Sequence, residues 1–364
     1  EKTHTLGTPF LMNRIAEWRA CRLGDPIERL RYLRRAARPS SGPKPALAAA
    51  GCLVLVLLPR SQGPRVPPPV SPARTGSARL AEAGRIWLVE TGEDHEIYSN
   101  GLRIETQWRT QSSPRRPFPV LPRDGTQGDS RIWHAATPAG IVFHATESDP
   151  APFVEDRNSV LLRQSEGTLA YARSRRAYHF VIDRFGRAFR IVPESQIAFH
   201  AGESVWADSR FLFADLNASF LGVAFDTRTG AEPPLTPAQI STGRALVEML
   251  RARYAIPRSD CVTHAQVSVN RGNGEIGWHT DFASGFPFEE LGLPDNYALP
   301  PASLYLAGFD YDRQFLRSAG SPMLRGIDLA EGMLHREAIA VNLSESRYRG
   351  KLRERYQNLS RSRP

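Results

Sequence analysis

The sequence contains few cysteines and lacks two common catalytic motifs. Of its 364 residues three are cysteines, Cys21, Cys52 and Cys261, which are too far apart to suggest a disulfide framework or a thiolate zinc site. Neither the GxSxG motif of serine hydrolases nor a phosphate-binding loop occurs. The GxGxxG match at Gly272–Gly277 has no βαβ unit around it, so it predicts a loop instead of a dinucleotide site.

Long apolar runs are also scarce. Residues 46–58 carry no charge, but a run of thirteen residues is short for a membrane span and fits the apolar part of a signal peptide. The arginine-rich residues 1–45 precede this run and favour an orientation with the N-terminal side in the cytoplasm. A Pro-rich linker follows at residues 59–85. We therefore expect a signal or membrane-anchor segment, with the downstream domain exported.

The chain is strongly basic. Its net charge is +9 and its isoelectric point is about 9.8. This balance favours polyanionic partners such as nucleic acid, an anionic membrane or wall polymers. The arginines of residues 1–45 are compatible with a nucleic-acid arm, but their place before an apolar segment favours a membrane flank. We therefore expect no nucleic-acid partner.

One stretch predicts a β-hairpin followed by a histidine. Residues 177–183 alternate as in a strand, with Tyr178 on the apolar face. Residues 183–187 supply the turn and residues 188–192 the partner strand. The chain then reaches His200. Taken alone, such a hairpin is an ordinary structural element.

Two further apolar strands end in histidines. Residues 140–146 place His144 after an apolar run, and residues 261–266 do the same for His264. Asp281 follows shortly afterwards. Two imidazoles and one carboxylate can hold Zn²⁺ and leave its fourth position open for water. Each of these residues alone is more often structural, so their spacing by itself is a weak signal.

The motifs occur in a characteristic order between Ala136 and Leu293. They are IVFHAT, AYHFVIDRFGRAFRIVPE with the following FHAG, NASFLGV, CVTHAQVS and HTD. In this order they resemble the zinc-dependent N-acetylmuramoyl-L-alanine amidases, a family shared with phage endolysins and animal peptidoglycan recognition proteins.

The resemblance implies an α/β fold with a mixed central β-sheet flanked by helices and a zinc site at the strand ends. One Zn²⁺ would be bound by His144, His264 and Asp281. The implied activity is hydrolysis of the amide bond between N-acetylmuramic acid and L-alanine in peptidoglycan. The alternative is a module of the same fold that binds peptidoglycan without cleaving it. Many such modules have lost the zinc residues, which are kept here.

Several positions depart from the family pattern. Phe282-Ala283 replaces Pro-Gly after the third ligand, and His279 replaces a lysine thought to steady the oxyanion. Ala224 stands where one branch has a catalytic glutamate. Another branch relies on the tyrosine of Tyr-His-Phe, which Tyr178 matches. The resemblance therefore implies Tyr178 and His279 as the catalytic residues, unless His279 merely packs beside Trp278.

The resemblance also implies two substrate contacts. His200 would orient a ligand or touch the substrate, and Asn217 would meet the peptide stem. The expected partners are thus peptidoglycan or muropeptides.

The composition divides the chain into six parts. They are a basic flank (1–45), a signal or anchor segment (46–58), a linker (59–85), a small β extension (86–135), the amidase-like domain (136–295) and a basic helical extension (296–364). The strands of the β extension, which include a hairpin with an Asn-Gly turn, either join the catalytic sheet or form a subdomain. The last part predicts helices at 328–341 and 344–359, expected to cap the domain.

Overall fold

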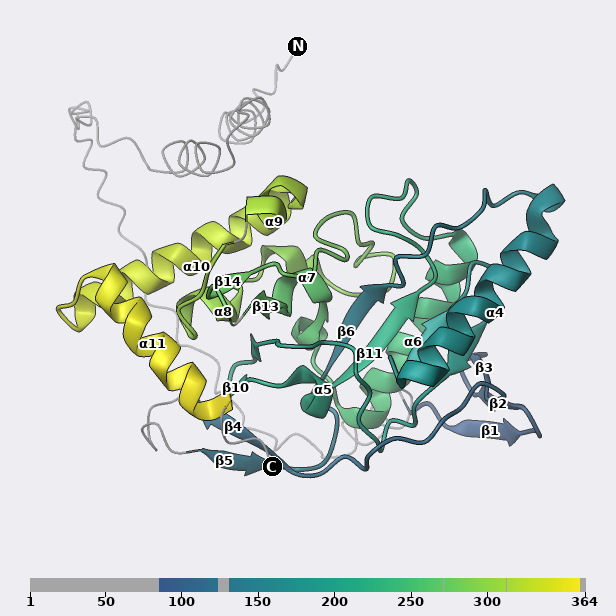
Figure 1. Ribbon diagram of the computed structural model, residues 1–364. Helices are drawn as coiled ribbons and strands as arrows, with labels where there is room; N and C mark the ends of the chain where they lie inside the picture. The colour runs from purple at the N-terminus through teal and green to yellow at the C-terminus, as the bar shows by residue number, and fades with distance from the viewer. Residues whose placement is uncertain (1–84, 124–130, 271, 312, 361–364) are drawn as a thin grey trace, which may run out of the picture.

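The computed structural model describes residues 85–123, 131–270, 272–311 and 313–360 (Figure 1). The predicted basic flank, the apolar segment 46–58 and nearly all of the linker lie outside these residues. Within the described ranges, none of the helices combines the length with the apolar character that crossing a membrane requires.

The centre of the fold is an eight-stranded β-sheet. Its strands, in spatial order, are β1 (Leu88–Thr91), β2 (His95–Tyr98), β3 (Arg103–Glu105), β8 (Ala188–Arg190), β7 (Phe180–Ile182), β11 (Phe220–Phe225), β6 (Gly140–Ala145) and β12 (Cys261–Thr263). Strands β7, β11, β6 and β12 are parallel, whereas β8 is antiparallel to β7. The predicted mixed sheet with flanking helices is therefore confirmed (Figure 1).

The middle strands are buried on both faces because their sequences are nearly continuous apolar runs. Side chains alternate between the faces. Phe143 and Phe225 pack in one apolar cluster with helix α6 (Pro237–Tyr254), and Ala224 packs in another with helix α4 (Asn158–Arg175). Alternation therefore directs His144, the neighbour of Phe143, toward the α4 side of the sheet.

Helix α6 begins at a capping box. The Thr236 hydroxyl accepts a hydrogen bond from the Gln239 N–H at 3.1 Å, and the Gln239 side chain accepts one from the Thr236 N–H at 3.0 Å. Two N–H groups that the helix cannot satisfy internally thus have partners.

The N-terminal strands complete the main sheet. Strands β2 and β3 form a hairpin, and β3 pairs in parallel with β8. The sequence left open whether residues 86–135 form a subdomain, and the structure places β1 to β3 in the catalytic sheet. A second sheet has the order β5 (Ile132–His134), β4 (Phe118–Pro122), β10 (Phe211–Phe213) and β9 (Trp206–Ala207).

Short elements connect these layers. They are η1 (Glu155–Arg157), α5 (Leu216–Ser219), η2 (Arg258–Asp260), α7 (His264–Val267), β13 (Val269–Asn270), β14 (Glu275–Ile276), η3 (Asn296–Ala298), α8 (Ala302–Tyr305), β15 (Asp310–Tyr311) and α9 (Arg313–Ser318).

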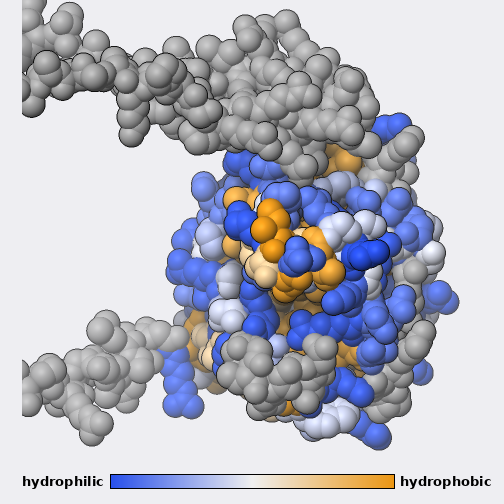
Figure 2. All heavy atoms as spheres, turned by 90° about the vertical axis from the view of Figure 1, so that its left-hand side faces the viewer, coloured by the Kyte–Doolittle hydropathy of each residue, from blue (hydrophilic) through white to orange (hydrophobic). Residues whose placement is uncertain are grey.

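Two long helices end the described chain. Helix α10 (Ser321–Ala340) and helix α11 (Glu345–Ser360) contribute Leu334 and Tyr356 to the same apolar cluster as Phe225 of the central sheet. The face on which their turn lies shows an apolar patch surrounded by polar side chains (Figure 2). Exposed apolar residues at that turn include Ile339 and Val341.

Candidate metal centre

The three predicted ligands converge at one edge of the sheet. His144 lies near the end of β6, and His264 directly follows β12. Because Thr263 pairs with Phe143 in parallel strands, both histidines come next after the same register pair. Asp281 lies in the loop after β14. Its Oδ1 is 2.8 Å from His264 Nδ1, and its Oδ2 is 3.1 Å from His144 Nδ1.

The centre is buried and its charges are arranged for a cation. The possible ligand atoms lie within 4.8 Å of one another. Burial, aided by the neighbouring His264, lowers the pKa of His144 to about 4, so this imidazole is neutral near pH 7. Burial by itself would raise the pKa of Asp281, but His264 and the hydrogen bond from His144 outweigh it and hold the pKa below its ordinary range. Neutral imidazole and ionised carboxylate are the metal-binding forms.

The outer contacts of the histidines complete this arrangement. His264 Nε2 lies 3.3 Å from the Ala201 carbonyl oxygen, and His144 Nε2 lies 3.1 Å from His200 Nδ1. Metal-binding histidines commonly donate their second ring N–H to such an acceptor, which sets the tautomer and the ring orientation. The donor set therefore fits one Zn²⁺ held by two Nδ1 atoms and a carboxylate, with a fourth position open.

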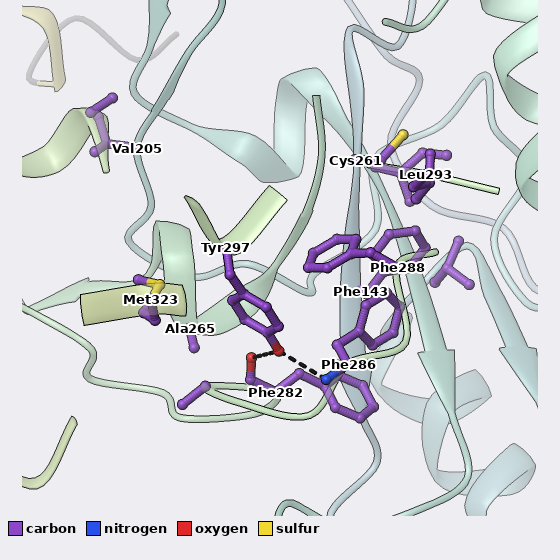
Figure 3. Close-up of a cluster of buried hydrophobic side chains, with 14 of the residues drawn as sticks. Phe143, Val205, Cys261, Ala265, Phe282, Phe286, Phe288, Leu293, Tyr297 and Met323 are labelled. Atoms are coloured by element: carbon purple, nitrogen blue, oxygen red, sulfur yellow. Dashed lines mark hydrogen bonds between the residues drawn. The ribbon is translucent and has the colours of Figure 1, made fainter. Parts of the chain in front are cut away.

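An aromatic cluster holds the loop that carries Asp281 (Figure 3). The Tyr297 hydroxyl donates to the Phe282 carbonyl at 2.7 Å and accepts from the Phe286 N–H at 3.1 Å. Phe286 stacks on Phe143, with 4.6 Å between ring centroids. The segment after Asp281 is thus anchored to β6, the strand that carries His144.

Tyr178 lies beside His144 in a strained backbone conformation. Its φ is 61°, in the left-handed region, so the predicted alternation from residue 177 is interrupted and β7 begins only at Phe180. Such strain persists where the surrounding structure enforces it, often at functional sites. The Tyr178 ring lies 5.1 Å from the His144 ring. Burial raises the pKa of Tyr178, so its hydroxyl remains a proton donor.

His279 packs on His264. Its ring is stacked on His264 with a centroid distance of 4.7 Å and an interplanar angle of 15°. Trp278 is 61% exposed and meets the His279 ring edge-on at 6.4 Å. The main ring contact of His279 is therefore a predicted ligand. The chain has no lysine between Lys44 and Lys351 that could take the place of the family lysine.

His200 lies on the other side of His144. Asn217 binds the backbone of His200. Asn217 Oδ1 accepts hydrogen bonds from the N–H groups of His200 and Ala201, both at 2.8 Å. Burial lowers the pKa of His200 well below its ordinary value, as do the neighbouring histidines. The side-chain oxygen of Asn217 is therefore already hydrogen-bonded within the protein. The predicted contact with a peptide stem would be made by the side-chain amide nitrogen.

Two residues of this region were not singled out in the sequence. Arg115 and His179 are both buried, and Arg115 Nη2 lies 3.1 Å from His179 Nε2. His179 Nδ1 accepts a hydrogen bond from the Gly222 N–H at 3.0 Å. An arginine in a loop rich in Pro and Arg carries no signal of burial, whereas the His179 of Tyr-His-Phe was visible only as a strand residue.

Comparison with known proteins shows what the central part of the chain is similar to. Residues 134–280 match the sequence profile of a family described as N-acetylmuramoyl-L-alanine amidase. The match includes His144 and His264 and ends one residue before Asp281. Over 132 residues the chain is 30% identical to the N-acetylmuramoyl-L-alanine amidase AmiD of Escherichia coli (strain K12), covering 34% of this chain and 44% of that protein. The chain thus spans less than half the length of this curated relative.

Solved structures of the same kind are more distant in sequence. Escherichia coli AmiD in complex with anhydro-N-acetylmuramic acid-L-Ala-D-gamma-Glu-L-Lys is 20% identical, with a TM-score of 0.37 over 60% of this chain and 97% of that chain. AmpDh3 from Pseudomonas aeruginosa in complex with anhydromuramic pentapeptide is 18% identical, with a TM-score of 0.34 over 53% of this chain and 90% of that chain.

Proposed function

We propose, from the membership of residues 134–280 in the N-acetylmuramoyl-L-alanine amidase family, that this protein hydrolyses the amide bond between N-acetylmuramic acid and L-alanine in peptidoglycan. The observation that carries the proposal is the convergence of His144, His264 and Asp281 within 4.8 Å inside a buried edge of the sheet. In the reaction, water adds to the lactyl carbonyl, the C–N bond breaks, and the products are a carboxylic acid and the amine of L-alanine.

His144, His264 and Asp281 would hold one Zn²⁺. When bound, the ion supplies a Lewis acid that polarises the scissile carbonyl and acidifies the attacking water. The protein keeps the ligand side chains in the protonation states that bind a metal. The buried neutral His144 and the ionised Asp281 are ready to bind a metal near neutral pH.

Tyr178 and His279 flank the ligands and would act on the reacting groups. The protonated Tyr178 hydroxyl would donate to the oxygen on which negative charge develops. Burial and the neighbouring His264 lower the pKa of His279, so its neutral ring has one N–H to donate and one nitrogen to accept a proton. His279 would therefore stabilise the oxyanion or carry the proton to the leaving amine.

His200 and Asn217 would serve the substrate side of the site. His200 orients His144 through the contact between Nε2 and Nδ1. The Asn217 amide nitrogen would donate to a carbonyl of the peptide stem.

The deciding experiment is mass spectrometry of purified muropeptides incubated with the protein. We expect a free peptide stem and a sugar that ends in a carboxylic acid. Activity should disappear on chelation and return with added Zn²⁺. Intact muropeptides after incubation with the zinc-loaded protein would refute the proposal.

A binding module that does not cleave is the second candidate, favoured by the replacement of the family lysine and glutamate by His279 and Ala224. Ala224 pairs in register with His144, so the glutamate position lies beside a predicted ligand and carries a methyl group here. Co-sedimentation with insoluble peptidoglycan, without release of any peptide stem, is the result that this candidate predicts.

The role of His279 is tested by two substitutions. His279→Ala should lower kcat about 10²-fold or more if the ring acts on the proton or the oxyanion. His279→Lys restores the family residue and should recover part of the rate. A His279→Ala variant with the wild-type rate would leave Tyr178 as the main catalytic residue.

The site of action proposed for the domain is the bacterial cell envelope. The basic residues 1–45, the apolar residues 46–58 and the Pro-rich linker support export or inner-membrane anchoring. A reporter fused after Arg79 should be active only outside the cytoplasm. A wholly cytoplasmic signal would instead indicate an enzyme that acts on released wall fragments.

A further inference from the structure

Arg115 lies outside the family match, in the segment between β3 and β4, yet its side chain is only 6% exposed. The backbone N–H of Arg115 donates to the Ser195 carbonyl at 2.8 Å, and the backbone N–H of Ile197 donates to the Ser113 carbonyl at 2.9 Å. The segment therefore runs along residues 195–197 as a strand would. This pairing fixes the backbone from which the guanidinium enters the interior.

The guanidinium binds the carbonyl oxygens of two separate segments. It donates to the carbonyls of Glu194 and Gln196 at 3.2 and 3.4 Å, and to those of Ala218 and Phe220, the latter at 3.4 Å. Burial lowers the pKa of Arg115 to about 10, so the group remains charged near neutral pH. A fork of five N–H donors suits several acceptors at once, which the ammonium group of lysine does not.

Both bound segments support His200. The first, residues 194–196, precedes His200 by a few residues in the chain. The second contains the Ala218 and Phe220 carbonyls and lies between Asn217, which holds the His200 backbone, and Gly222. A methyl group at Gly222 would lie 2.5 Å from His200 Cγ, so the ring rests directly on this glycine.

His179 ties the same parts together. The Gly222 N–H donates to its Nδ1, so in the neutral ring the proton is on Nε2. That Nε2 lies 3.1 Å from the Gln196 carbonyl, which Arg115 also binds. Burial, followed by the Arg115 charge, lowers the pKa of His179 well below its ordinary value and keeps the ring neutral.

We propose that Arg115 is a positioning residue of the metal centre. By linking residues 194–196 to residues 218–220 it fixes the framework on which His200 rests. His200 Nδ1, 3.1 Å from His144 Nε2, then sets the orientation of His144 as a metal ligand. The proposal rests on the proposed function, because it assumes that His144 binds Zn²⁺.

The test compares Arg115→Ala and Arg115→Lys with Arg116→Ala, an exposed arginine one position further along. Zinc affinity of the metal-free full chain is measured by competition with a chromophoric chelator, without substrate. We expect Arg115→Ala to bind Zn²⁺ about 10- to 100-fold more weakly, the range found when contacts behind metal ligands are removed. Arg115→Lys should be intermediate and Arg116→Ala unchanged. Equal affinities for all three variants and the wild type would overturn the proposal.

Rescue by free guanidinium ion distinguishes a positioning role of Arg115 from a contribution to overall stability alone. A cavity of about 320 Å³ is lined by both sequence neighbours of Arg115, Pro114 and Arg116, and by Ala218, whose carbonyl Arg115 binds. Millimolar guanidinium should restore the zinc affinity and kcat of Arg115→Ala, with KM little changed throughout. If the zinc affinity falls in proportion to the melting temperature and guanidinium does not restore it, Arg115 has only a structural role. That result would also overturn the proposal.

Two further outcomes are kept apart by the zinc measurement. If the wild type binds Zn²⁺ but cleaves no muropeptide, the proposed function fails while the affinity comparison still decides on Arg115. If the wild type cleaves and Arg115→Ala matches it in affinity and kcat, only the inference on Arg115 fails. Should Arg115→Ala not fold, Arg115→Lys gives the same comparison, and wild-type affinity in that variant would count against the proposal.

Discussion

The two sides of His144 are built differently. On one side its Nδ1 meets Asp281, a charged carboxylate that also contacts His264. On the other side its Nε2 meets His200, which rests on a glycine inside a framework of backbone carbonyls. The first side consists of donor side chains that suit a metal, whereas the second consists of main-chain groups linked by Arg115.

This difference explains why the side chains around His144, His200 among them, were named from the sequence, whereas the main-chain framework behind His200 was not. Histidine and aspartate side chains can bind a metal, and the family resemblance placed His144, His264 and Asp281 in one ligand set. Backbone carbonyls occur at every residue, so a framework made of them leaves no pattern in the sequence. The same difference predicts unequal effects: loss of a donor should abolish metal binding, whereas damage to the framework should only weaken it.

The largest effect is expected on the metal side. His264→Ala removes one of the three proposed ligands, and Asp281→Asn removes the negative charge that would neutralise the cation. Either change should abolish zinc binding and lower activity on the order of 10³-fold, equivalent to the several kcal/mol that a Lewis acid contributes. Elemental analysis and the muropeptide assay measure both effects. The control is His335→Ala, an exposed histidine on α10.

A His264→Ala variant that binds zinc and is active would contradict the comparison of the two sides of His144, since it would place the metal elsewhere. So would purified wild type that takes up no zinc when the ion is added.

The next effect separates catalysis from metal binding. Tyr178 contacts His144 through its ring, and its hydroxyl stays protonated because burial raises its pKa. Tyr178→Phe keeps the ring and should leave zinc affinity unchanged, while kcat falls about 10²- to 10³-fold, the cost of one oxyanion donor. The control is Tyr171→Phe, which alters a tyrosine that is 61% exposed. Weaker zinc binding in Tyr178→Phe would instead make the tyrosine a structural support of the metal side.

The fold shows the same contrast between local and distant signals. The hairpin of β2 and β3, with its Asn-Gly turn, was predicted from local pattern and is present. Its place in the main sheet depends on the pairing of β3 with β8, about eighty residues away, which no local pattern encodes. Both C-terminal helices were predicted, but α10 begins at Ser321 instead of residue 328, with a proline in its first turn.

A smaller effect tests the framework side directly. Gly222→Ala would place a methyl group 2.5 Å from His200 Cγ. Overpacking of this kind costs about 1–3 kcal/mol, so the melting temperature and the zinc affinity should fall together. Gly167→Ala on α4 is the matched control: apart from the adjoining residues of the helix itself, no atom lies within 4 Å of the added methyl, and the helix should gain about 0.5–1 kcal/mol. A Gly222→Ala protein with wild-type zinc affinity would show that the position of His200 does not matter for the metal.

The smallest effect concerns a second buried carboxylate, which sharpens the comparison because its hydrogen-bond donors are uncharged. Asp260 precedes β12, at the opposite end from His264, and its hydrogen bonds come from Trp206 Nε1 and the Ser259 hydroxyl. Burial raises the pKa of Asp260 to about 6, whereas the histidines hold that of Asp281 low. The Asp260 pKa is thus above its unfolded value of 3.8.

A raised carboxyl pKa stabilises the fold only while the group is protonated. The contribution of Asp260 is complete below about pH 4 and is lost as pH rises through about 6. Asp260→Asn keeps an oxygen that accepts from Trp206 but cannot ionise. Relative to wild type it should therefore gain about 2 kcal/mol in the free energy of unfolding between pH 4 and pH 8. Denaturant unfolding at both values measures this, with the exposed Asp156→Asn as control. An equal difference between variant and wild type at the two pH values would mean that Asp260 is ionised at both, and that burial alone does not separate the two carboxylates.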